Sequence, residues 1–173
     1  MDVGWVLPVC WFSLGLIVVG CSVGAQRSRR ALGLGIAAVA MLWVVAGAGA
    51  NLYFVMRGDD FSGFADEAST SFVRDTWESL VVPHHAVFIG LLILFEATAG
   101  AAVLVPGRVR QVALVLLMGF NVALLPFGWA YLGWSVPLIA ALESLRRADR
   151  RWPVSVGQAL RSGGPAAPAR TAR

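Results

Sequence analysis

Residues 111–142 read QVALVLLMGFNVALLPFGWAYLGWSVPLIAAL and contain no charged side chain. A single helix of this length would measure about 48 Å, whereas the hydrocarbon core of a bilayer is about 30 Å thick. Pro126 and Gly128 lie near the middle of the run, and both residue types interrupt helices. The run therefore predicts two membrane-spanning helices, about 109–125 and 134–148, that are joined by a turn.

Aromatic residues gather at this predicted turn. Trp129, Tyr131 and Trp134 follow the break, and tryptophan and tyrosine are enriched where a membrane meets water. With Trp77, which comes just before another apolar run, we expect them to form an aromatic belt at the outer interface. Pro137 would then fall in the first turn of the second helix, where a proline costs little.

Three further runs are almost free of charge. Residues 3–26 and 31–56 carry no charged side chain, and residues 79–107 carry only Glu96. Each run reaches the roughly 20 apolar residues that a membrane-spanning helix needs. Of the 173 residues, 58% are hydrophobic and 14% are charged, against about a quarter charged in ordinary soluble domains. The composition excludes a soluble enzyme and predicts an all-α integral membrane bundle of five transmembrane helices.

The basic residues predict the orientation of the chain. All 14 of them are arginine, and nine lie in three clusters at 27–30, 108–110 and 146–151. Because loops rich in arginine stay on the cytoplasmic side, we expect the N-terminus outside and the C-terminus inside. We expect a multi-pass protein of a bacterial cytoplasmic (inner) membrane. The arginines form no single patch and accompany no reading motif, so nucleic-acid binding is not expected.

The connection at residues 57–82 has a different character from the other loops. It is rich in aspartate and glutamate, which suits the outer face. Its apolar residues recur at mostly three- to five-residue spacings: Phe61, Phe64, Ala68, Phe72, Trp77 and Leu80. This pattern predicts an amphipathic helix that lies on the outer membrane surface. The segment either seals the outer end of the bundle or caps a ligand site.

The expected organisation has three parts. An N-terminal transmembrane helix occupies 1–26, a four-helix membrane bundle occupies 27–150, and residues 151–173 form a cytoplasmic tail. The tail is rich in glycine, alanine and proline, which predicts disorder. Residues 18–21 also match a loose lipoprotein cleavage pattern, but the N-terminus lacks the positive charge of a signal peptide.

Glu96 is the charged residue that the apolar runs accommodate least easily. It lies about 18 Å along a helix that begins at His84, and an acidic side chain at the bilayer centre costs about 2.5–3.5 kcal/mol on insertion scales. The carboxyl must therefore face the bundle interior. Two roles remain open for it, a proton-relay or ligand-binding group and a structural hydrogen bond to a neighbouring helix.

His84 and His85 begin the same helix. His85 precedes Glu96 by eleven residues, and eleven steps of about 100° return to within about 20° of the same face. His85 is therefore a candidate proton carrier or ligand, and the alternative is an interfacial residue that bonds water or headgroups. Adjacent histidines point about 100° apart and no third ligand is near, so no metal site is expected.

Asn51 and Asn121 are side-chain amides within the predicted spans. Each can hydrogen-bond across helices, worth about 1 kcal/mol, and either is a candidate partner of Glu96. The sequence contains no Ser-His-Asp set, phosphate loop or CxxC pair. Catalysis by this chain alone is therefore not expected. A role as the membrane subunit of a quinone-linked oxidoreductase is still an open alternative.

The order of Glu96, Gly100, Gly107 and Arg110 along two apolar helices resembles the DoxX-like family of small membrane proteins, over about residues 31–148. The resemblance implies a four-helix bundle with both ends inside, which this chain extends by an N-terminal span. Proteins similar to this pattern include a quinone-linked subunit of a thiosulfate-oxidising complex and membrane parts of redox-stress assemblies. The resemblance therefore implies a redox setting.

Two functions follow as hypotheses. The first is a membrane subunit that binds a quinone or similar lipophile beneath the outer segment, with Glu96 and His85 handling protons and a separate protein donating electrons. The second is a non-catalytic scaffold or accessory subunit of a membrane transport or envelope complex. The small-residue seams at 20–24, at 46–50 and at Gly100, which permit close helix approach, favour this second hypothesis. The expected partners are the lipid bilayer, other membrane or redox proteins, and a second copy of the chain.

Overall fold

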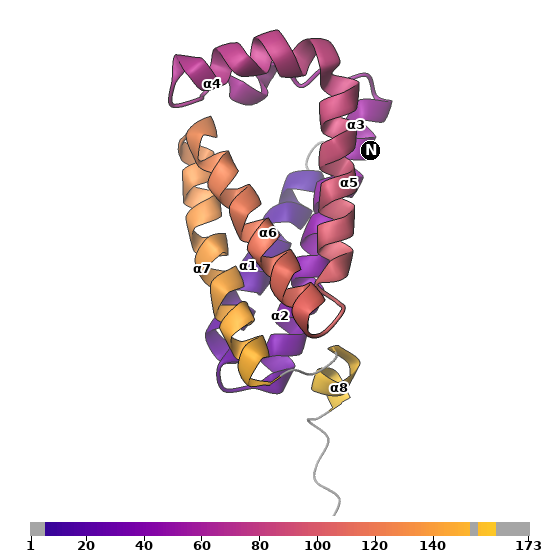
Figure 1. Ribbon diagram of the computed structural model, residues 1–173, viewed down its shortest axis with the longest axis vertical. Helices are drawn as coiled ribbons and strands as arrows, with labels where there is room; N and C mark the ends of the chain where they lie inside the picture. Colours follow the sequence, from indigo (N-terminus) through magenta and orange to yellow (C-terminus); the bar gives the residue numbers. More distant parts are fainter. Residues whose placement is uncertain (1–5, 153–155, 162–173) are drawn as a thin grey trace, which may run out of the picture.

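The computed structural model describes residues 6–152 and 156–161, and every regular element among them is helical. The prediction of an all-α protein is confirmed. Within these residues, four helices are long and apolar enough to cross a membrane: Val6–Ala25, Arg29–Met56, Ser71–Ala102 and Arg108–Phe127. The fifth predicted span, about 134–148, is not among them, so the prediction of five spans is not confirmed. The helices run along one long axis (Figure 1), so the apolar runs of the sequence form a bundle.

The first two long helices form an antiparallel pair. α1 (Val6–Ala25) and α2 (Arg29–Met41) are joined by a tight turn, and Ser28 caps α2 by accepting a hydrogen bond from the backbone N–H of Ala31 at 3.3 Å. The second helix continues as a π-helical segment, η2 (Leu42–Gly49), and then as α3 (Ala50–Met56). A π-helix within an α-helix is rare and frequently marks a functional site.

The acidic connection covers one end of the bundle, which we call the outer end after the predicted orientation; the opposite end is called the inner end. It contains the short 3-10 helix η3 (Ser62–Ala65), then α4 (Ser71–Thr76), the π-helical η4 (Trp77–Val81) and the 3-10 turn η5 (Val82–His84). Figure 1 shows α4 lying across the end of the bundle, crosswise to α5 (His85–Ala102). The predicted surface helix is therefore present over only part of 57–82.

The predicted apolar stripe of this segment is only partly correct. Phe61, Phe64 and Trp77 are partly buried and Ala68 is buried, whereas 76% of the Phe72 surface is exposed. Leu80 is also exposed. The helical register is lost between η3 and α4, and η4 is π-helical, so residues spaced for one continuous α-helix do not share a face.

The last two long helices correct the predicted boundaries. α6 (Arg108–Leu124) and the 3-10 turn η6 (Leu125–Phe127) lie close to the predicted helix. α7 (Trp129–Arg151) begins five residues earlier than predicted, so Pro137 lies inside the helix and not in its first turn. The turn ends at Gly128, whose φ is 123°. α7 therefore begins at the next residue and includes Trp129, Tyr131 and Trp134.

Small residues set how closely the helices approach. A Cβ atom added to Gly35 of α2 would lie 2.7 Å from Leu145 Cδ2 of α7, and one added to Gly100 of α5 would lie 3.0 Å from Trp43 Cβ of η2. Without a water-driven force between helices in lipid, such close van der Waals packing and interhelical hydrogen bonds hold a bundle together.

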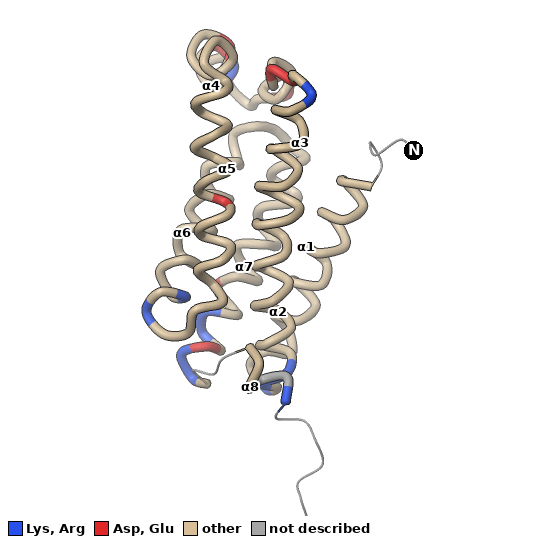
Figure 2. Tube along the Cα trace, turned by 90° about the vertical axis from the view of Figure 1, so that its right-hand side faces the viewer, with Lys and Arg blue, Asp and Glu red and all other residues tan. Residues whose placement is uncertain are grey.

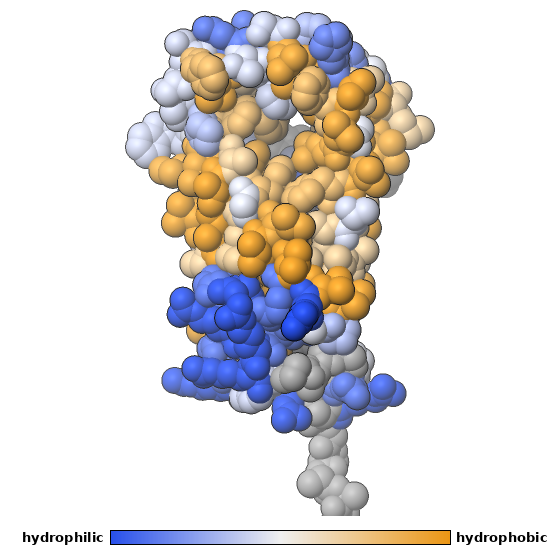
Figure 3. Space-filling view, in the orientation of Figure 1, coloured by the Kyte–Doolittle hydropathy of each residue, from blue (hydrophilic) through white to orange (hydrophobic). Residues whose placement is uncertain are grey.

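Charge and hydropathy follow the long axis. Figure 2 shows the charged residues mostly at the two ends of the bundle, and Figure 3 shows an apolar band between two hydrophilic ends. At the inner end, the short helix α8 (Val156–Arg161) packs against α2. The rest of the predicted tail beyond Trp152, at 153–155 and 162–173, lies outside the described residues.

Candidate functional site

Glu96 lies in the middle of α5 and faces another helix. Its side chain is buried, and its Oε2 accepts a hydrogen bond of 2.8 Å from the Nδ2 amide of Asn51 on α3. The inward orientation is the one expected from the cost of exposing a carboxyl to lipid. Of the two candidate amide partners, the structure brings Asn51 to Glu96.

The other amide is used within its own helix. The Nδ2 of Asn121 donates a hydrogen bond of 2.8 Å to the carbonyl of Leu117, one turn earlier in α6. Asn121 is buried, and this contact leaves it anchored to the backbone of α6. The helical spacing from Leu117 to Asn121, i to i+4, is a signal for such a contact that the sequence already contained.

The π-helical segment η2 makes room for the carboxyl of Glu96. A Cβ atom added to Gly47 would lie 2.8 Å from Glu96 Oε1 and 3.0 Å from Glu96 Cδ, so only glycine fits without displacing the side chain. Gly47 is fully covered by its surroundings. Gly47 therefore accommodates the carboxyl of Glu96.

A cavity of about 690 Å³ lies beneath α4 and reaches Glu96. Its lining comes from all the long helices and from the acidic connection: Leu7, Pro8, Trp11, Phe12, Ala46, Gly47, Ala50, Asn51, Phe54, Phe61, Phe64, Trp77, Val81, Phe88, Ile89, Leu92, Glu96, Phe120, Ala123, Leu124, Phe127, Ala130, Tyr131 and Trp134. Among the lining residues of α5, Glu96 is the farthest from α4. The cavity is therefore apolar along its length, with a carboxyl at its inner end.

Helices α5 and α6 spread apart towards the outer end, beneath α4 (Figure 1). In the same orientation, Figure 3 shows the apolar surface hollowed below the hydrophilic outer end. The cavity is lined there by Phe88 of α5 and Ala123 of α6, both of which are exposed at the surface. The side of the cavity between these helices therefore faces the surroundings of the bundle, where lipid would lie.

An aromatic cluster roofs the cavity and holds the outer segment in place. The Phe64 ring stacks on Trp77 with centroids 4.7 Å apart, and it lies 5.1 Å from the Phe127 ring and 5.2 Å from the Tyr131 ring. The Nε1 of Trp77 donates a hydrogen bond of 2.8 Å to the carbonyl of Phe61. These contacts join the outer segment to the turn between α6 and α7.

Two backbone contacts reinforce this junction. The N–H of Ser69 donates a hydrogen bond of 2.8 Å to the carbonyl of Pro126. A Cβ atom at Gly128 would lie 2.7 Å from the carbonyl oxygen of Glu67. The outer segment is therefore attached covalently at α3 and α5 and by noncovalent contacts at the α6–α7 turn.

The predicted aromatic belt is divided by the structure. Trp77, Tyr131 and Trp134 line the cavity, and the Trp134 ring lies 5.6 Å from the ring of Trp11 in α1. Trp129 points away, with 84% of its surface exposed. Successive residues of a helix are rotated by about 100°. The first turns of α7 therefore contribute Tyr131 and Trp134 to the cavity wall and Trp129 to the outer surface.

The histidines lie near the outer end and do not join Glu96 among the cavity-lining residues. His84 is exposed, and His85 Nδ1 lies 2.9 Å from the carbonyl of Val82. A hydrogen bond from the Ser62 N–H lowers the pKa of the exposed Asp60 carboxyl below its usual value, and the charge of His85 adds a smaller effect in the same direction. His85 therefore interacts with the loop before η3.

The residues that carry the family resemblance have structural roles. Gly100 lies against Trp43 and Val44, and Gly107 has φ of 88°, a conformation that favours glycine. Arg110 is buried and pairs with Asp149 of α7 at 2.5 Å, while its Nε donates a hydrogen bond of 2.7 Å to the carbonyl of Val103. Arg110 thereby links the end of α5 to α7.

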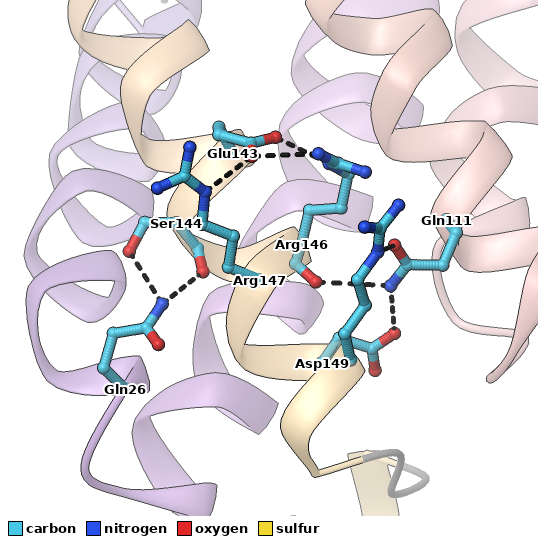
Figure 4. A network of polar contacts seen from close by, with 8 residues as sticks. Gln26, Gln111, Glu143, Ser144, Arg146, Arg147 and Asp149 are labelled. Atoms are coloured by element: carbon cyan, nitrogen blue, oxygen red, sulfur yellow. Dashed lines mark hydrogen bonds and ion pairs between the residues drawn. The ribbon is translucent and has the colours of Figure 1, made fainter.

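Asp149 is a residue that sequence reasoning missed. It lies in a stretch with four arginines, so its sequence context suggests a solvated charge, yet it is buried. Its Oδ2 also accepts a hydrogen bond of 2.7 Å from Gln111 Nε2, as Figure 4 shows. The available signal was the spacing of three and then four residues from Leu142 to Leu145 to Asp149, which places Asp149 on the buried face of α7.

The same inner network reaches α1. The Nε2 of Gln26 donates a hydrogen bond of 2.7 Å to the carbonyl of Ser144, and Glu143 pairs with Arg146 and Arg147 (Figure 4). These contacts tie α1, α6 and α7 together at the end opposite the cavity. The inner end is thus closed by polar contacts, and the outer end is covered by the aromatic cluster.

No group of three or more histidine, cysteine, aspartate or glutamate side chains that could hold a metal ion occurs within the described residues. Comparison of the chain with protein families, with curated proteins and with solved structures found no match. The cavity and the chemistry of its lining are therefore the features from which a function can be inferred.

Proposed function

We propose that this protein is a multi-pass membrane protein that binds a lipophilic molecule with one polar end in the cavity beneath α4. The observation that carries the proposal is an apolar cavity of about 690 Å³ with the carboxyl of Glu96 at its inner end. This volume lies within the roughly 300–1,000 Å³ of sites for small molecules and cofactors. Apolar walls with few convergent polar groups are typical of such sites.

A quinone has the form that this lining suits. Its flat ring would pack between aromatic side chains such as Phe120 and Trp134, and a protonated Glu96 would donate a hydrogen bond to a quinone carbonyl. Its isoprenoid tail would leave between α5 and α6 into the bilayer. In this proposal the protein is a membrane subunit of a redox complex. A separate protein donates the two electrons that reduce the quinone to the quinol. Glu96 exchanges one of the two protons that this reduction takes up, and water supplies the other.

The proposed topology has five spans, with the N-terminus outside and the C-terminus inside. Two observations support it: α7 runs antiparallel to α6 over the height of the bundle (Figure 1), and the arginines of 27–30, 108–110 and 146–151 lie together at the end opposite α4 (Figure 2). Under the positive-inside rule that end is cytoplasmic. We place the protein in a bacterial cytoplasmic membrane, as a relative of the DoxX-like family.

Fluorescence titration with a quinone tests the binding proposal. Trp11, Trp77 and Trp134 line the cavity, so a bound quinone should quench tryptophan emission. The purified protein in mild detergent is titrated with decylubiquinone, and saturable quenching is expected. Glu96→Leu, which removes the hydrogen-bond donor at similar size, should weaken the apparent affinity about tenfold, as expected for the loss of one hydrogen bond.

A pair of neighbouring substitutions on α6 supplies the control. Ala123 lines the cavity, so Ala123→Phe places a ring in it. Val122→Phe also introduces a ring, but Val122 is 53% exposed and does not line the cavity. Only Ala123→Phe should abolish saturable quenching. Equal quenching in both variants would indicate that the quinone partitions into the detergent micelle, and it would remove the case for a site.

A further inference from the structure

A second hollow lies on the seam between α5 and α6, on the side of Phe95 that faces the inner end. It is a groove of about 410 Å³ whose lining includes Phe95, Thr98, Ala102, Arg108, Val112 and Leu116. The groove exists because small residues, Ala99 and Ala102 on α5 and Ala113 on α6, face it. It is apolar along its length and has an arginine at its inner end.

The groove is separate from the cavity that holds Glu96. The rings of Phe95 and Phe120 lie 5.6 Å apart across the seam, and Phe120 lines the cavity while Phe95 lines the groove. This aromatic pair therefore divides the seam into two compartments. A ligand of one compartment does not need to enter the other.

Arg108 differs from the arginines that surround it. Arg110 pairs with Asp149, Arg146 and Arg147 pair with Glu143, and Arg150 donates a hydrogen bond of 3.0 Å to Gln111 Oε1. The guanidinium of Arg108 makes no hydrogen bond or ion pair within the described part of the chain, and the residue is exposed. Its positive charge therefore stays available at the end of the groove.

We propose that this groove binds an anionic phospholipid, with an acyl chain along the groove and the phosphate diester on Arg108. The apolar lining suits a hydrocarbon chain, and a guanidinium forms charge-assisted hydrogen bonds with phosphate oxygens. Basic residues between helices at the membrane interface bind anionic headgroups in this way. The site is independent of the lipophile-binding cavity, because neither Glu96 nor Asn51 lines it.

Native mass spectrometry of the full chain tests the site. The protein in mild detergent, with its native lipid removed, is mixed with phosphatidylglycerol or phosphatidylcholine of the same acyl chains. The wild type should retain phosphatidylglycerol more strongly. Arg108→Gln should reduce this retention about fivefold, the size expected when one basic residue near a membrane surface is lost, while Arg27→Gln, an exposed arginine away from the groove, should not.

A second pair of variants tests whether an acyl chain lies in the groove. Ala102→Phe places a ring in the groove and should reduce the retention of both lipids, whereas Ala101→Phe, at the exposed neighbouring residue, should leave both unchanged. Thermal unfolding of each variant shows whether it is folded. If a phenylalanine variant is unstable, the test depends on Arg108→Gln, because Arg108 is exposed and its substitution does not disturb the packing. Equal loss in Arg27→Gln, or displacement of the lipid by glycerol phosphate, would overturn the proposal.

Discussion

The side-chain amide of Asn51 donates a hydrogen bond of 2.8 Å to Glu96 Oε2, and this contact joins α3 to the middle of α5. Both residues line the cavity beneath α4. The amide satisfies one carboxyl oxygen in a region where water is scarce, and it orients the carboxyl toward the cavity. The contact therefore contributes both to the packing of the bundle and to the geometry of the site.

Removing the amide should weaken the bundle through Glu96. We expect Asn51→Ala to lower the free energy of unfolding by about 1 kcal/mol, the size of an interhelical hydrogen bond in a membrane protein. The effect should shrink in a Glu96→Leu background, because leucine cannot accept the hydrogen bond and both substitutions then remove one contact. Unfolding in mixed detergent, followed by circular dichroism, measures this coupling. Asn121→Ala, whose amide bonds its own helix, should show no coupling to Glu96→Leu.

Gly47 should accept a side chain only if Glu96 moves. In Gly47→Ala the new Cβ would lie 2.8 Å from Glu96 Oε1, so the carboxyl must move, and overpacking of this kind costs about 1–3 kcal/mol. Gly49→Ala, two residues along the same segment, has its nearest neighbour at 3.6 Å and should be neutral. Equal thermal stability of the two variants would mean that Gly47 does not support Glu96.

The buried pair of Arg110 and Asp149 should be costly to break. Asp149→Asn leaves the arginine buried without its counter-charge, and losing one partner of a buried pair costs about 3–5 kcal/mol. The exposed pair of Arg147 and Glu143 offers the comparison, because breaking a surface pair costs about 0–1 kcal/mol. Denaturant unfolding of Asp149→Asn and Arg147→Gln in detergent should show this difference, and similar losses would contradict it.

The outer segment should loosen when its contact with the α6–α7 turn is disturbed. Gly128→Ala introduces a Cβ at 2.7 Å from the Glu67 carbonyl and imposes φ of 123° on alanine, which strains the backbone. We expect hydrogen exchange in 61–77 to accelerate severalfold. Gly133→Ala, whose Cβ would meet nothing within 4 Å, is the matched control. Unchanged exchange in Gly128→Ala would show that the segment is held elsewhere.

Some features of the site were readable from the sequence, and others were not. The isolation of Glu96 in an apolar run predicted that it faces the interior, and the glycines at 46–50 and 100 predicted close helix approach. The sequence also placed His85 on the face of Glu96, but the structure turns His85 toward the loop near Asp60. His85 and Glu96 lie on one face of α5, but they are eleven residues apart along the helix. Their side chains therefore meet different neighbours.

Hydropathy and charge by themselves determined the class of protein. Apolar runs long enough to cross a bilayer, arginines between them and an acidic, aromatic connection predict helices, their approximate ends and a covered outer end. These properties can be inferred from each segment separately, because in lipid the backbone N–H and C=O groups must form their hydrogen bonds within their own helix. No tertiary contact is needed to infer them.

Only the tertiary structure decided which residues meet. It paired Glu96 with Asn51 and not with Asn121, it buried Asp149 beside Arg110, and it left a cavity where α5 and α6 diverge. These outcomes depend on helix rotation, on helix crossing and on the small residues at each contact. Such quantities are set by the packing of several helices at once, so no single stretch of sequence contains them.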